Sequence, residues 1–154
     1  TRVHLAFAPP DADSVGTVRS GTTANEDLWV DAGVFHLLPR ADFDASVEGW
    51  AALGPVPEGA VAFGRLADPE AWIGLEIVLR DAEGVAHAAR YAGDDGVPED
   101  RVGTSSEGSF AAFGLAPGPM DVQFFEADSL VGDGFPSRAE EGAVTDLDGL
   151  EILP

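Results

Sequence analysis

Alternation of apolar and polar residues dominates this chain and predicts short β-strands. In the clearest case, Met120, Val122 and Phe124 share one face of a strand whose other face is mostly polar. This strand follows a run of small residues and phenylalanines at 109–115 and a Pro/Gly turn at 116–119. Two runs of this kind joined by such a turn predict a β-hairpin.

The same period of two residues recurs along most of the chain. Leu75, Ile77 and Leu79 fall on one face of a strand at 73–80. The glycine-rich segment 128–142 is expected to be a long loop. Further strands are expected at 1–8, 60–67, 85–91, 143–145 and 150–153, with shorter ones at 15–19, 28–30 and 34–38.

One segment, residues 42–53, has the period of a helix. Phe43, Val47 and Trp50 are spaced at i, i+4 and i+7, which places them on one helix face. The chain as a whole therefore predicts an all-β sandwich of roughly seven to nine strands with one short helix. The residues expected in its core are Phe63, Leu75, Ile77, Leu79, Phe110, Val122 and Phe124.

The hairpin region carries a family resemblance. A phenylalanine lies two residues after Gly108, and the turn at 115–118 reads Leu-Ala-Pro-Gly. This pattern resembles the carboxypeptidase-regulatory-like or transthyretin-like (prealbumin-like) β-sandwich, and residues 59–68 and 74–80 resemble that family's first two strands. The resemblance covers roughly residues 59–152 and implies an Ig-like antiparallel sandwich. It implies little about function, because sandwiches of this type host many roles.

A Pro/Gly-rich break at residues 54–59 predicts the boundary between two parts of the chain. Residues 1–58 are expected to form an N-terminal β extension that includes the short helix. Residues 59–154 are expected to form the prealbumin-like sandwich.

The acidic composition of the chain limits the partners that the protein can bind. The 154 residues include 28 Asp and Glu against 8 basic residues, all arginine, for a net charge of −20. Such an acidic protein repels nucleic acid and anionic membrane surfaces, so neither is expected as a partner. Two explanations of the charge remain open, a salt adaptation of the halophilic type and a surface that binds cations.

Two further features of the composition limit the chemistry. The chain has no cysteine, which excludes disulfides and thiolate metal sites. It also has no run of 18 apolar residues, so no membrane insertion is expected.

The acidic loop at residues 93–100 is the best candidate for a calcium site. Hard cations take several oxygen ligands from one flexible turn, and the loop reads GDDGVPED. A solvated loop is the alternative, and no other cofactor is expected. The four candidate ligands are Asp94, Asp95, Glu99 and Asp100.

No catalytic pattern is found, so an enzyme is not expected. His4, His36 and His87 each fall in a predicted strand, and their spacing does not bring them together. H-E-x-x-H, G-x-S-x-G and P-loop patterns are absent. Two enzyme families share prealbumin-like topology. The iron site of intradiol dioxygenases needs two tyrosines, and this chain has only Tyr91; the Tyr-Arg-Gly-Ser motif of hydroxyisourate hydrolases is absent as well.

The sequence therefore predicts a non-catalytic structural or interaction module. We expect it to be extracytoplasmic, secreted or at the cell surface, as a subunit of a larger assembly or filament. The alternative is a Ca²⁺- or carbohydrate-binding module, with Trp29, Trp50 or Trp72 stacking on a sugar. Trp72 lies in a predicted turn, so it is the tryptophan most expected to be exposed.

The N-terminal strand is the expected contact with other protein subunits or with a second copy of the chain. Residues 1–8 alternate as a strand, and an unpaired strand edge invites pairing. Segment 28–38 adds apolar residues outside the family-like core. The residues expected at this contact are Val3, Leu5, Phe7, Trp29 and Phe35.

Overall fold

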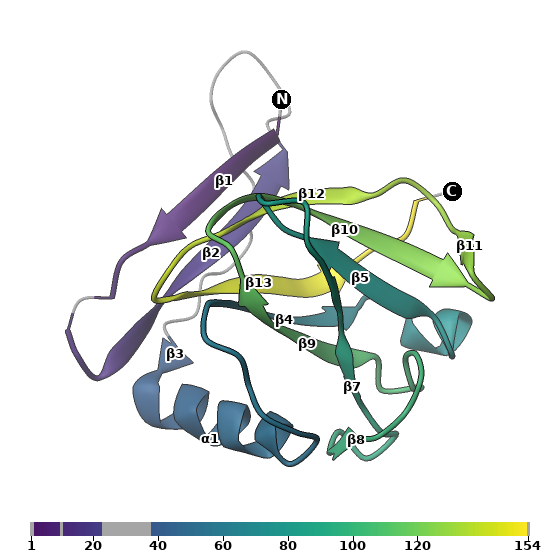
Figure 1. Ribbon diagram of the computed structural model, residues 1–154, viewed down its shortest axis with the longest axis horizontal. Helices are drawn as coiled ribbons and strands as arrows, with labels where there is room; N and C mark the ends of the chain where they lie inside the picture. Colours follow the sequence, from purple (N-terminus) through teal and green to yellow (C-terminus); the bar gives the residue numbers. More distant parts are fainter. Residues whose placement is uncertain (1, 10, 23–37, 154) are drawn as a thin grey trace.

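The structure, a computed structural model, describes residues 2–9, 11–22 and 38–153. Within these ranges two β-sheets pack against each other, and helix α1 (Arg40–Ala51) covers part of the outer face of the larger sheet (Figure 1). The prediction of an all-β sandwich with one short helix is confirmed at this level, but the expected seven to nine strands are wrong, because the described residues contain thirteen. No helix in the described ranges has both the length and the apolar character needed to cross a membrane.

The larger sheet contains eight strands. They are β1 (Arg2–Phe7), β2 (Ser14–Thr22), β3 (Leu38–Pro39), β4 (Ala60–Leu66), β7 (Arg90–Ala92), β8 (Pro98–Glu99), β9 (Ser109–Leu115) and β13 (Ala143–Leu150). Their order is β1-β2-β13-β4-β9-β7-β8, with β3 paired to β2. β13 runs parallel to both of its neighbours, and the other pairs of this sheet are antiparallel.

The smaller sheet contains five strands, all paired antiparallel. They are β5 (Glu76–Arg80), β6 (Ala86–Ala88), β10 (Gly118–Glu126), β11 (Ser129–Leu130) and β12 (Phe135–Ala139). The order is β11-β10-β5-β6, and β12 also pairs with β10.

Three expected element boundaries are wrong. The segment 128–142 is not a single loop, because it contains β11 and β12. The strand expected at 85–91 is divided at Ala89, where the chain leaves the smaller sheet as β6 and enters the larger one as β7. Toward the end of the chain, one strand, β13, replaces the two expected at 143–145 and 150–153.

The core lies between the facing sheets and confirms most of the predicted set. Phe110 is buried so closely against β4 that the position opposite it, Gly64, has no room for a side chain. A Cβ atom at Gly64 would lie 2.8 Å from the Cβ of Leu147, which is too close for any other residue. The confirmed core residues, each at most 1% exposed, are Leu75, Ile77, Leu79, Phe110, Val122 and Phe124.

The prediction for Phe63 is wrong. Its side chain is half-buried on the outer face of the larger sheet, where it packs with Phe43 of α1 and with Phe113. The centroid of the Phe63 ring lies 6.1 Å from that of Phe43 and 6.0 Å from that of Phe113. Both faces of β4 are apolar, because one meets the smaller sheet and the other meets α1, so alternation alone does not identify the inner face.

The division of the chain at residues 58 and 59 stays a prediction. β2, which belongs to the N-terminal part, pairs with β13 from the C-terminal part. The expected extension 1–58 and the expected sandwich 59–154 therefore share one sheet.

Candidate functional site

The candidate site is a hollow of about 390 Å³ between η1 (Pro69–Trp72) and the residues that follow β13. Ligand sites in proteins typically enclose roughly 300–1,000 Å³ and have mainly apolar walls with a few polar groups. This hollow has that size, but more of its exposed lining is polar than apolar. Its apolar walls include Trp72, Leu150, Ile152 and Leu153, and its charged side chains are Asp68 and Glu151.

Thr104 fixes the η1 side of the hollow. Its side chain is fully buried, and its hydroxyl donates a hydrogen bond to the carbonyl oxygen of Trp72. The same hydroxyl oxygen accepts the backbone N–H of Leu75 at 3.1 Å. The backbone N–H of Gly74 also donates to the carbonyl oxygen of Thr104 at 2.7 Å. The turn that carries Trp72 is thus held by a residue about 30 positions further along the chain.

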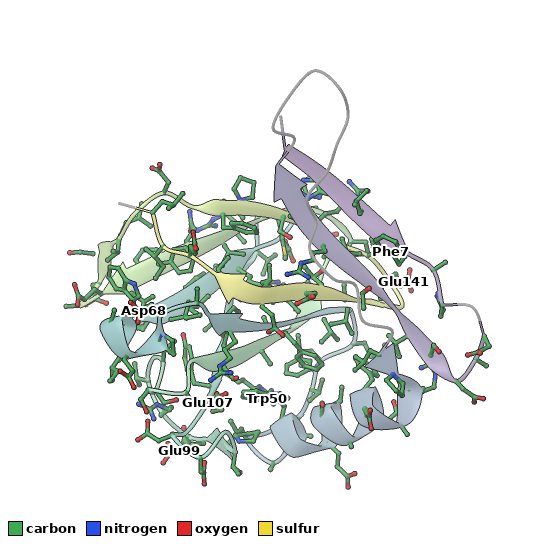
Figure 2. All side chains as sticks on the ribbon, turned by 180° about the vertical axis from the view of Figure 1, so that it is seen from behind. Phe7, Trp50, Asp68, Glu99, Glu107 and Glu141 are labelled. Atoms are coloured by element: carbon green, nitrogen blue, oxygen red, sulfur yellow. The ribbon has the colours of Figure 1, made fainter. Side chains whose placement is uncertain are left out.

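Backbone hydrogen bonds fix the opposite side. The N–H of Ala67 donates to the carbonyl oxygen of Leu150 at 3.0 Å, which joins the residues before η1 to the end of β13. The N–H of Asp133 donates to the carbonyl oxygen of Leu153 at 3.1 Å, while Ile152 packs against the core between the sheets. Figure 2 shows Asp68 beside η1, at the end of the molecule away from β1 and β2.

One lining residue of this hollow, and the residue that follows Trp72 in the chain, are exposed and apolar. Ile73, which follows Trp72, and Leu153 are each 59% exposed. Trp72 itself is half-buried, because part of its ring packs against the core. Trp50 is buried between α1 and the larger sheet (Figure 2), and Trp29 lies outside the described residues. Trp72, the tryptophan that the sequence predicts to be most exposed, therefore lines the hollow, whereas Trp50 does not.

The four residues predicted to bind calcium are all exposed, around the turn between β7 and β8. The Oδ1 atom of Asp94 accepts the backbone N–H of Ser106 at 3.0 Å and its hydroxyl at 2.6 Å. The hydroxyl bond is the main cause of a lowered pKa of Asp94. The Oδ1 atom of Asp95 accepts the N–H of Val97 at 3.0 Å.

The other two predicted ligands do not complete a metal site. Glu99 forms an ion pair with Arg101 at 3.3 Å, and Asp100 is exposed just after β8. Across residues 2–9, 11–22 and 38–153, no three acidic or histidine side chains gather closely enough to hold a metal ion. Calcium binding by this loop stays a prediction.

A buried carboxylate, Asp81, was not recognised in the sequence. Its side chain is 2% exposed and accepts four hydrogen bonds. Oδ1 accepts the backbone N–H groups of Glu83 and Val85, both at 3.0 Å. Oδ2 accepts the backbone N–H of Ala116 at 3.1 Å and Nε2 of His87 at 2.7 Å. Asp81 thus joins the β5–β6 turn to the β9–β10 turn.

His87 and Arg90 line a second, smaller hollow of about 190 Å³. This volume is below the range of roughly 300–1,000 Å³ that is typical of ligand sites. The guanidinium group of Arg90 already donates to the carbonyl oxygens of Trp50, Gly54 and Pro55. Both side chains therefore serve local structure, and the larger hollow is the better candidate site.

The histidines do not come together among the described residues. His4 contacts the hydroxyl of Ser20 at 2.7 Å, whereas His87 is bonded to Asp81. His36 lies outside the described residues.

The predicted subunit contact is only partly described. β1 pairs with β2 of its own chain over six residues, from Arg2 opposite Thr22 to Phe7 opposite Thr17. Val3 lies in β1, Leu5 is half-buried, and Phe7 is exposed. Trp29 and Phe35 lie outside the described residues. Contact with another subunit at these residues stays a prediction.

Comparison with known proteins identified no relative of this chain. No family model, curated protein or solved structure matches it. The resemblance of residues 59–152 to transthyretin-like sandwiches stays a prediction. Function is therefore inferred from the geometry of the chain itself.

Proposed function

We propose that this protein is a non-catalytic interaction module on a transthyretin-like sandwich, and that it binds another protein through the end formed by η1 and residues 150–153. The observation that carries the proposal is the hollow of about 390 Å³ lined by Trp72. Leu153, which is exposed, lines the same hollow, and the equally exposed Ile73 directly follows Trp72 in the chain. Clustered exposed apolar side chains mark interaction sites, and tryptophan is enriched among the residues that dominate binding energy.

The non-catalytic part of the proposal is supported by what the polar groups do. Asp81 and His87, an acid and base pair by chemistry, are bonded to each other and join two turns. The hollow next to His87 encloses about 190 Å³, less than a typical substrate site. Asp94 and Asp95 accept hydrogen bonds from the neighbouring backbone. The hydrogen bonds of these four side chains stabilise turns of the fold.

Carbohydrate binding is a second candidate function for the same surface. A sugar ring stacks on an aromatic face, and carboxylates accept hydrogen bonds from its hydroxyl groups. Trp72 supplies the aromatic side chain, and Asp68 and Glu151 supply the carboxylates. We favour a protein partner because the exposed Leu153 lines the hollow and the exposed Ile73 directly follows Trp72 in the chain.

Site-specific photo-cross-linking tests the proposed function. A photoreactive amino acid replaces Ile73 in one sample and Val85, which is 48% exposed in the β5–β6 turn, in a matched control. Both proteins are expressed in the source cells and irradiated. We expect a discrete cross-linked partner from position 73 alone, and the same cross-link with that partner after purification. Absence of a partner at position 73, or equal products from both positions, contradicts the proposal.

A further inference from the structure

The charge of the hollow beside Trp72 has one sign. Among the residues that the structure describes, Asp68 and Glu151 are its only charged lining residues, both are exposed, and no arginine lines it. Ionised carboxylates accept hydrogen bonds and do not donate them, so they favour a ligand that brings donors and positive charge. The polar chemistry of the site is therefore selective for a cation.

The side chains of the remaining lining residues are apolar, which limits the kind of cation, although polar atoms make up most of the exposed lining. Trp72, Leu150 and Ile152 offer an indole ring and aliphatic surface next to the carboxylates. Lysine and arginine side chains match this combination, because each carries a charged group on an apolar stem. Tryptophan is also the aromatic side chain that attracts such cations most strongly.

From these observations we propose that the hollow receives a lysine or arginine side chain of the partner protein. The inference rests on the proposed function and specifies the chemistry of its partner. A bare metal ion makes no use of the apolar side chains, and a neutral sugar offers hydrogen-bond donors to the two carboxylates but no positive charge. An acidic partner is repelled.

The charge of the whole molecule favours the same occupant. A net charge of −20 attracts basic proteins over distances of about a Debye length and speeds their association. The same charge opposes contact between two copies of this chain at this surface. The partner is thus expected to be a different, basic protein.

Short peptides test this recognition directly. The probes are acetylated, amidated Gly-Ser-Xaa-Ser-Gly peptides in which Xaa is lysine, arginine, norleucine or glutamate. Binding is followed at low salt by the NMR signal of the Trp72 indole N–H. We expect the lysine and arginine peptides to bind about tenfold more tightly than the norleucine peptide, and the glutamate peptide not to bind.

A charge-matched pair of variants separates local recognition from the overall field. Asp68→Asn with Glu151→Gln removes both carboxylates of the hollow, and we expect it to weaken lysine-peptide binding about tenfold. The control, Asp44→Asn with Glu58→Gln, removes the same charge at exposed positions elsewhere, and we expect a change below about twofold. Equal losses in both variants overturn the proposal, as does equal affinity for the norleucine peptide.

Two further outcomes distinguish this inference from the proposed function. If photo-cross-linking at Ile73 is unchanged by the Asp68→Asn, Glu151→Gln pair, the interaction module stands and recognition of a basic side chain is overturned. If glucose oligosaccharides shift the Trp72 signal while no peptide binds at millimolar concentration, recognition of a basic side chain is overturned in favour of the carbohydrate candidate.

Discussion

Burial and hydrogen bonding shift the pKa of the Asp81 carboxyl group in opposite directions. Burial raises its pKa, but the hydrogen bonds from Ala116, His87, Val85 and Glu83 together outweigh burial and lower the pKa from 3.8 to about 2. The folded protein therefore binds a proton at Asp81 more weakly than the unfolded chain does. The stability that follows is present above pH 3.8 and is lost as the pH falls through about 2.

Asp81→Asn is expected to lower the free energy of unfolding at neutral pH by about 1–3 kcal/mol, because an amide cannot accept all four hydrogen bonds. Urea unfolding at about pH 7, 4 and 2 measures the effect. The difference between the unchanged protein and the variant should shrink toward the lowest pH, where Asp81 becomes protonated. Asp95→Asn is the control, because its single bond from Val97 survives in an amide. A difference that is constant across pH contradicts the account of Asp81.

Ile77 tests the assignment of the core at a single residue. It is fully buried, whereas Ile73, four residues earlier, is 59% exposed. Ile77→Ala is expected to cost about 2–5 kcal/mol of unfolding free energy, because it leaves a cavity between the sheets. Ile73→Ala should change stability by less than about 0.5 kcal/mol. Denaturant unfolding of both variants checks the pair, and comparable costs would argue against the assigned faces.

At the scale of elements, α1 depends on a residue of β7 for its position. Arg90 donates to the carbonyl oxygens of Trp50 at 2.9 Å and of Gly54 and Pro55 just beyond the helix. Its guanidinium carbon also lies 5.4 Å from the centroid of the Phe113 ring. One side chain of the sheet therefore bonds one carbonyl group in the last turn of α1 and two in the segment that follows the helix.

Arg90→Met should release that end of the helix while keeping an apolar stem against Phe113. We expect a loss of about 1.5–3 kcal/mol in unfolding free energy, typical of hydrogen bonds to a charged group. Hydrogen–deuterium exchange should rise in α1 more than in β10. Arg80→Met, which removes a single exposed bond to Gly84, serves as the control. Similar exchange in α1 for the two variants contradicts this role for Arg90.

At the scale of the whole molecule, acidic residues exceed basic ones by 28 to 8. Self-repulsion of this kind destabilises the compact state and is screened by salt. The melting temperature is therefore expected to rise between low salt and molar NaCl. Sucrose at matched osmolality is the control, because it stabilises proteins by exclusion without screening charge. Equal melting temperatures in low and high salt would remove the salt-adaptation explanation of the charge.

The elements with a clear local period were predictable from the sequence. β5 and β10 each bury one face, so the alternation at Ile77 and Val122 identified both strands and their inner faces. The helical spacing of Phe43, Val47 and Trp50 likewise identified α1. In each case the element buries a single apolar face, so its apolar residues repeat with a regular period. This repeat is visible within a few adjacent residues of the sequence.

The candidate site was predictable only in part. The sequence predicts exposure of Trp72 because this tryptophan lies in a predicted turn, but it places Glu151 and Ile152 in a closing strand. They reach the hollow because β13 pairs with β4 and ends opposite Leu66, just before η1. No local pattern records which distant strands pair.

The sequence by itself determined the strand-rich class, the position of the helix, the acidic charge and most residues of the core. The tertiary structure alone decided that Phe63 faces α1, that the chain changes sheets at Ala89, and that Thr104 holds the turn of Trp72. The physical reason is the range of the interactions. Alternation and helical spacing follow from burial of neighbouring residues, whereas sheet order, register and the second apolar face depend on contacts between residues far apart in the chain.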